Sequence, residues 1–276
     1  MERIFTFFVG ALAALTCGIA SAHQPGHVLR EEKSVAVDGI QETWQLVWEG
    51  KPAESLCGPH QVFMAITCPC TGFGYAEQGK LFLVRHHGGR QIERMALSPL
   101  FGGIGFDNPV WRDNGRLAVL PRWGEPVVPG DADRESAGDP RLVPEIMHRE
   151  KTTALKLADY DHDGRATEFL LHVANMPCGN QYDVAVGISR NAPRLHALTS
   201  VATPGKPLLL PRHAWAALLT GAGKHDVVEW ECGDHGSDLH QELTVSSDNG
   251  RISARRRDFS CPFDAGHPNL LSDEAF

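Results

Sequence analysis

The stretch that decides the fold runs from residue 241 to residue 259 and reads QELTVSSDNGRISARRRDF. Two β-rich runs, Gln241–Ser246 and Arg251–Phe259, flank a turn at Asp248–Gly250. This turn contains Asn-Gly, which is favoured in type I′ hairpins because both central residues need a positive φ. Together with the β-rich run Asp226–Glu231 just upstream, the pattern predicts an antiparallel meander of three strands.

Short β-rich runs separated by Gly, Pro and polar turns recur over the rest of the chain. We expect further strands at Thr43–Trp48, Lys80–Arg85, Gln91–Leu97, Thr153–Leu157, Glu168–Val173, Tyr182–Ser189 and Arg194–Ser200, with a turn at His86–Gly89. The spacing therefore predicts a mainly β protein with a minor helical part, built from antiparallel sheets and hairpins.

One short helix is expected near residues 211–220. Pro211 suits the first helical turn, and Gly221 is placed to cap the end. We expect Trp215, Leu218 and Leu219 to share the buried face of this helix.

The first 22 residues predict export. A short apolar run after Arg3 is followed by Ala20-Ser21-Ala22, an A-x-A cleavage pattern. A membrane anchor, or a lipoprotein attached through Cys17, is the alternative interpretation. We expect a signal peptide at 1–22, no membrane-spanning segment in the mature chain, and a periplasmic or secreted location.

The mature chain, 23–276, is expected to form a single β-rich globular domain. The Pro-rich, charged stretch at 122–146 is expected to be a long loop, and an alternative organisation has two halves on either side of it. Hydrophobic residues make up 42% of the chain and its net charge is -8, which disfavours disorder and nucleic-acid binding.

Six cysteines remain after the predicted cleavage, an even number in an exported chain. They are Cys57, Cys68, Cys70, Cys178, Cys232 and Cys261. Up to three disulfides are expected. Cys232–Cys261 is the favoured single pair, because both residues lie at the same end of the predicted meander.

Residues 159–168, DYDHDGRATE, form the most specific motif of the sequence. Carboxylates at Asp159, Asp161 and Asp163 alternate before Gly164, so three of them can converge in one tight loop. Ca²⁺ prefers six to eight oxygen ligands, and the main-chain carbonyl of Arg165 can supply another. The motif therefore predicts a calcium site.

This loop resembles the D-x-D-x-D-G calcium loops of EF-hands, dockerin modules and FG-GAP repeats. The resemblance covers about ten residues and implies calcium binding, without a whole fold. Leu170 stands where an EF-hand has its bidentate Glu, and the flanks alternate like strands. Glu168 is therefore expected to be the closing ligand. The simpler alternative is a solvated acidic turn.

Weaker chemical signals have simpler structural interpretations. Asp234, His235, Asp238 and His240 form the candidate acid–base or zinc cluster, with Glu229 or Glu231 nearby, and a polar turn is the simpler alternative. His86 and His87 with Cys68 and Cys70 suggest copper, although oxidation to disulfides is favoured. Arg255, Arg256 and Arg257 are expected on a solvated strand edge.

Three function classes follow from these features. A binding or scaffold module with structural calcium is favoured, because no complete catalytic motif occurs. The alternatives are a hydrolase acting on an envelope or extracellular polymer and a periplasmic metal-handling protein that uses the 14 His of the chain.

Overall fold

The predicted C-terminal meander is present and has a fourth strand. The computed structural model orders this sheet β14 (Gly223–Trp230), β15 (Leu239–Asp248), β16 (Arg251–Ser260) and β17 (Leu270–Ala275), all antiparallel. Asn249 and Gly250 have φ of 49° and 77°, as a type I′ turn requires. Because β17 pairs with β16, the three arginines of β16 lie inside the sheet and not on an edge, contrary to expectation.

The structure describes residues 26–56, 62–63, 68–69, 75–101, 117–121, 141, 151–175 and 181–276. The predicted signal peptide lies outside these residues. So does the predicted loop at 122–146, apart from residue 141.

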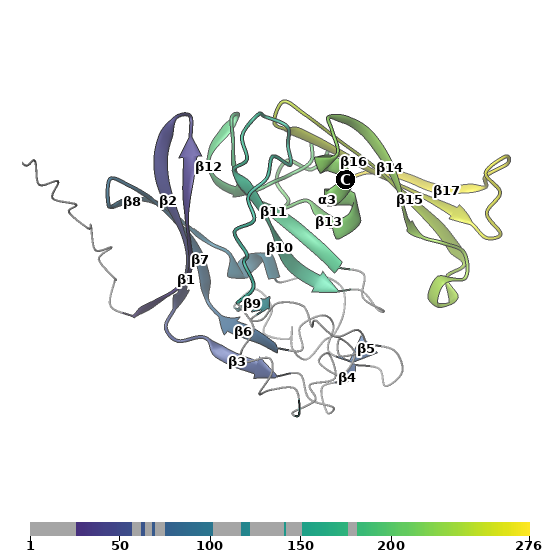
Figure 1. Ribbon diagram of the computed structural model, residues 1–276. Helices are drawn as coiled ribbons and strands as arrows, with labels where there is room; N and C mark the ends of the chain where they lie inside the picture. Colours follow the sequence, from purple (N-terminus) through teal and green to yellow (C-terminus); the bar gives the residue numbers. More distant parts are fainter. Residues whose placement is uncertain are drawn as a thin grey trace, which may run out of the picture.

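The chain has two further sheets of four strands, and the middle one of the three lies between the first sheet and the C-terminal sheet (Figure 1). The first has the order β1 (His27–Val37), β2 (Ile40–Glu49), β7 (Leu81–His87) and β8 (Arg90–Ala96). The middle sheet has the order β10 (Glu168–Asn175), β11 (Gln181–Ser189) and β12 (Ala192–Ala197), and β13 (Leu209–Pro211) also pairs with β11. All pairings in both sheets are antiparallel, which confirms the predicted fold class.

Smaller elements complete the described part of the chain. A sheet of three strands has the order β3 (Ala53–Leu56), β6 (Tyr75–Gly79) and β9 (Ala118–Pro121), and β4 (Val62–Phe63) pairs with β5 (Cys68–Pro69). Two 3₁₀ turns, η2 and η6, span Ser98–Phe101 and Asp234–Gly236. Among the described residues, no helix has both the length and the apolar character needed to cross a bilayer.

The middle sheet separates two hydrophobic cores. On one face, Phe169 and Val186 pack with the first sheet, for example with Trp44. On the other face, Ala185 packs with the helix and with the C-terminal sheet, for example with Val245. Consequently every residue of β11 except Gln181 is buried, and the strand lacks the alternation of a half-exposed strand.

The single predicted helix is α3 (Arg212–Leu219), which Pro211 precedes as the N-cap residue. Trp215 and Leu218 are fully buried, as expected. Leu219 is 43% exposed and therefore lies off the buried face, contrary to expectation. The helix ends at Thr220, which keeps right-handed helical geometry, so Gly221 does not act as the cap.

The expected strand at Thr153–Leu157 is not formed. Side chains of β1 satisfy its backbone in place of a partner strand: Glu31 accepts the N–H groups of Ala154 and Leu155 at 2.7 and 3.0 Å. Lys33 donates to the carbonyl of Leu155 at 2.9 Å. Charged residues of β1 thus hold this segment extended against the sheet without adding it to a ladder.

Cys232 and Cys261 form the predicted disulfide pair, with Cα atoms 5.7 Å apart. Cys232 follows β14, and Cys261 follows β16, so the pair joins two strands that flank β15 at one end of the sheet. The side chains of the other four cysteines lie outside the described residues, and their predicted pairing remains a prediction.

Candidate metal centre

The acidic loop is closed at its base by an isolated antiparallel bridge. The N–H of Ala158 donates to the carbonyl of Glu168 at 2.8 Å, and the N–H of Glu168 donates back at 3.2 Å. Two residues of the loop have left-handed backbone conformations, His162 at φ 52° and Gly164 at φ 89°. The chain therefore folds back sharply over its own carboxylates.

Asp159 organises the turn through both carboxylate oxygens. Its Oδ1 accepts the N–H of Asp163 at 3.0 Å, and its Oδ2 accepts the N–H of Gly164 at 3.0 Å. Asp side chains in tight turns commonly accept hydrogen bonds from nearby backbone N–H groups in this way.

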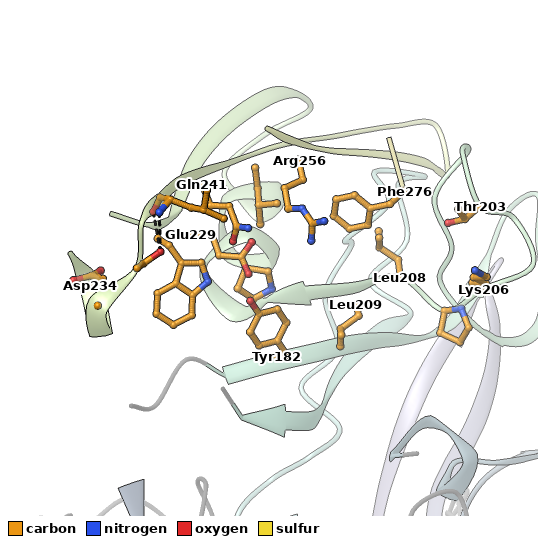
Figure 2. Close-up of a pocket in the computed structure, with 17 residues that line it drawn as sticks. Tyr182, Thr203, Lys206, Leu208, Leu209, Glu229, Asp234, Gln241, Arg256 and Phe276 are labelled. Carbon is orange, nitrogen blue, oxygen red and sulfur yellow. Dashed lines mark hydrogen bonds between the residues drawn. The ribbon is translucent and has the colours of Figure 1, made fainter. Parts of the chain in front are cut away.

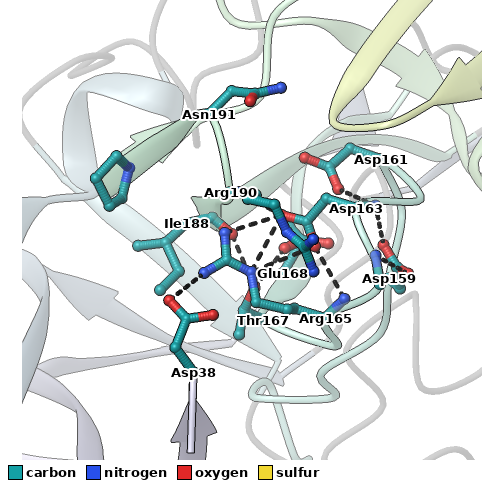
Figure 3. Close-up of polar contacts among 12 residues, drawn as sticks. Asp38, Asp159, Asp161, Asp163, Arg165, Thr167, Glu168, Ile188, Arg190 and Asn191 are labelled. Atoms are coloured by element: carbon teal, nitrogen blue, oxygen red, sulfur yellow. Dashed lines mark hydrogen bonds and ion pairs between the residues drawn. The ribbon is translucent and has the colours of Figure 1, made fainter. Parts of the chain in front are cut away.

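Three carboxylates converge inside the loop: oxygens of Asp159, Asp161 and Glu168 all lie within 4.8 Å of one another (Figure 3). Asp161 and Glu168 are only 1% and 0% exposed. Glu168 accepts the N–H of Tyr160 at 3.0 Å and the hydroxyl of Thr167 at 2.7 Å. The buried Oδ2 of Asp161 has no hydrogen-bond partner in the described part of the chain.

Burial and crowding disfavour the charged forms of these groups. Burial raises the pKa of the Glu168 carboxyl to about 9, and the charge of Asp161 acts in the same direction. Burial also raises the pKa of Asp161, with the neighbouring charges of Asp163 and Asp159 adding to the effect. Buried carboxylates of this kind need a proton or a cation to compensate them.

Asp163 lies in the loop, as predicted, but its carboxylate is paired with other groups of the protein. Its carboxylate pairs with the guanidinium of Arg165 at 3.1 Å and accepts the N–H of Arg165 at 2.9 Å and the N–H of Arg190. Arg165 also pairs with Asp38 at 3.0 Å (Figure 3). The structure thus brings Asp159, Asp161 and Glu168 together and joins Asp163 to arginine.

Several partners of the loop come from other elements and could not be predicted from the local sequence pattern. Arg190, in the β11–β12 turn, donates its N–H to Asp163 through tertiary placement alone. Thr167, which donates to Glu168, is its neighbour within the loop itself. The N–H of Gly250, in the β15–β16 turn, donates to the carbonyl of Asp161 at 2.9 Å. On the other side, His162 Nε2 lies 2.6 Å from the carbonyl of Leu218 in α3. The loop is therefore fixed to both the helix and the C-terminal sheet.

We expect Asp163→Asn to lower the free energy of unfolding by about 1–2 kcal/mol, because it weakens a buried charge-assisted pair. The loss should be equal in calcium and in chelator, since Asp163 compensates arginine. Urea unfolding in both conditions measures this. A loss confined to the calcium condition would instead make Asp163 a cation ligand.

The weaker predicted cluster is spread over different surroundings. Asp234 and Asp238 are exposed. His240 is buried, stacks on Phe263 with ring centroids 3.7 Å apart, and has its Nε2 at 3.5 Å from Glu242. The side chain of His235 lies outside the described part. No hydrogen bond or ion pair joins the side chains of Asp234, Asp238 and His240 in the described chain.

His86 and His87 belong to β7, and the turn that follows them is limited to Gly88 and Gly89, with φ of 56° and 75°. The side chains of Cys68 and Cys70, their predicted copper partners, lie outside the described residues.

Comparison with family models, with curated proteins and with solved structures found no match to this chain.

Proposed function

We propose that this chain is an exported β-sheet binding module whose fold is completed by one structural Ca²⁺. The observation that carries the proposal is the convergence of Asp159, Asp161 and Glu168 within 4.8 Å, two of them fully buried. Bringing these carboxylates together in the ionised form is unfavourable unless a cation lies between them.

Calcium fits this donor set better than a softer metal. The three converging side chains offer only oxygen, and bidentate carboxylates with solvent can reach the six to eight donors that Ca²⁺ takes. The carbonyl of Arg165, expected from the sequence, is the further protein donor. Zinc and copper favour imidazole and thiolate, which this set lacks.

A structural role is supported by the contacts around the loop. Its backbone and side chains bond to the β15–β16 turn, to α3 and to the β11–β12 turn, through Gly250, Leu218 and Arg190. A cation held in the loop would therefore stabilise the packing of the middle sheet against the C-terminal sheet. The role of the cation would be structural: it would hold the residues of a binding surface in place and would take no part in a chemical step.

The test is the metal content of purified protein equilibrated with calcium and then dialysed. We expect one calcium per chain in the parent protein. Asp161→Ala should retain none, whereas Asp163→Asn, its neighbour that pairs with arginine, should retain the full amount. Absence of calcium from the parent, or equal retention in Asp161→Ala, would contradict the proposal.

A further inference from the structure

A pocket of about 720 Å³ lies between the middle sheet and the C-terminal sheet (Figure 2). This volume is within the range of small-molecule sites. Tyr182 and Leu209, from β11 and β13, form one wall, and Leu208 and Phe276 extend the apolar lining. The other wall carries Glu229, Gln241 and Arg256, one from each of three adjacent strands.

A β-bulge turns two consecutive residues of β14 into this pocket. Val228 pairs with Glu242 and Trp230 pairs with Gln241, so Glu229 is the extra residue. In a regular strand, Glu229 and Trp230 would face opposite sides of the sheet. Both line the pocket here. Bulges that redirect a side chain are common beside functional sites.

Glu229 presents its carboxyl to the pocket without a partner. It makes no hydrogen bond and no ion pair within the described part of the chain. Burial raises the pKa of this carboxyl to about 7; the charge of Arg256 lowers it and the charge of Asp258 raises it. The carboxyl is thus partly buried with no hydrogen-bond donor or ion-pair partner in direct contact among the described residues, although the charge of Arg256 acts on it.

Arg256 is only loosely compensated on the same wall. The nearest acidic oxygens are 3.6 Å away in Asp258 and 3.8 Å away in Glu274, beyond normal hydrogen-bond length. Its buried Nε has no hydrogen-bond partner in the described residues. The Arg256 side chain is 42% exposed, so the remaining nitrogens of the guanidinium can still receive a carboxylate, for which its planar fork is suited.

We propose that this pocket binds a small zwitterion with an apolar side chain, of the class of free apolar amino acids and dipeptides. The ammonium group pairs with Glu229, and the carboxylate pairs with Arg256. The apolar side chain lies on the wall formed by Tyr182, Leu208 and Leu209. Opposite charges on one wall and apolar side chains on the other match this ligand and leave no ligand charge uncompensated.

This inference rests on the proposed binding function and names its ligand. The probes are L-phenylalanine and L-leucyl-L-phenylalanine, titrated by calorimetry into calcium-loaded protein. N-acetyl-L-phenylalanine, which lacks the ammonium, and L-phenylalanine amide, which lacks the carboxylate, are the matched ligands. We expect each single-charge ligand to bind at least tenfold more weakly than whichever of the two zwitterions has the higher affinity.

Two variants assign the charges. Glu229→Gln should abolish the preference for the free ammonium, and Arg256→Gln should abolish the preference for the carboxylate. Arg255→Gln is the control, because Arg255 is exposed on the opposite face of β16 and pairs with Asp273. It should bind as the parent does.

The affinity of the parent should also fall by about tenfold or more between pH 8 and pH 6. Glu229 is ionised above its pKa of about 7 and loses its charge below it, so the ammonium loses its partner in acid. In the described part of the chain, the other titratable or charged groups facing the pocket region are Tyr182, Lys206, Asp234, Arg256, Asp258 and Glu274. Glu229→Gln should remove this pH dependence.

Three results would overturn the assignment: no binding of either zwitterion at millimolar concentration, equal binding of the single-charge ligands, or unchanged selectivity in both variants. Calcium content measured on the same sample separates this failure from failure of the proposed function. If the protein contains calcium but binds neither zwitterion, the ligand assignment is contradicted and the proposed calcium site is not.

Discussion

Replacing Gly187 by alanine should lower the free energy of unfolding by about 3 kcal/mol or more. Gly187 lies in β11 directly opposite Glu168 in β10. A Cβ there would overlap the carbonyl oxygen of Thr167 and lie 2.8 Å from Cα of Glu168. These are backbone atoms, so the two strands would have to separate at the base of the acidic loop.

The matched control is Gly205→Ala, because a Cβ at Gly205 meets no atom within 4 Å. Urea unfolding should show the control near the parent and Gly187→Ala far below it. Because the displaced strand carries Glu168, Gly187→Ala should also weaken calcium binding. A stability equal to that of the control would mean that the strands are not packed this closely.

Replacing both Cys232 and Cys261 by serine should lower the free energy of unfolding by about 3 kcal/mol. The pair closes a loop with a sequence separation of 29 residues, and loss of that constraint increases the entropy of the unfolded chain. Urea unfolding of the double variant against the parent measures the difference.

The linkage itself is tested by peptide mapping of unreduced protein. The peptide that contains Cys232 should be found linked to the peptide that contains Cys261, and reduction should separate the two. Finding Cys232 as a free thiol in the folded protein would contradict the assignment.

The C-terminal sheet was largely predictable because local signals agreed with the tertiary structure. Asn249 and Gly250 set the register of the β15–β16 hairpin, and alternation identified its strands. The same logic applies to Asp38 and Gly39, with φ of 49° and 80°, which join β1 to β2. The Asp-Gly pair is a hairpin-turn signal in the sequence, but β1 contains so many charged residues that its sequence does not predict a strand.

β17 and the extended segment before Ala158 could not be predicted from local pattern. β17 is mostly exposed and is defined by its pairing with β16. In the other segment, Thr153–Leu157, strand-like alternation reflects packing, while the backbone bonds to the side chains of Glu31 and Lys33. These side-chain partners lie more than a hundred residues away in the sequence, so the local pattern does not reveal them.

The acidic loop was predictable in its residues but not in the role of each. Alternating carboxylates before Gly164 identified the motif, and Glu168 joins Asp159 and Asp161 in the converging set. The pairing of Asp163 with Arg165 follows from the turn, which brings together two side chains that lie two positions apart in the sequence. The pocket at Glu229 depends on a bulge, whose position is set by the neighbouring strand.

The most direct test of the account is thermal unfolding of the parent protein and of Asp161→Ala in 5 mM calcium and in chelator. An extracellular-type site with a Kd of about 10⁻⁴–10⁻³ M would add about 1–2 kcal/mol to the parent, since the ligand binds only the folded state. For a chain of this size, that is a rise of about 3–6 °C in the midpoint. Asp161→Ala should show no rise. A parent midpoint unchanged between calcium and chelator would contradict the calcium site.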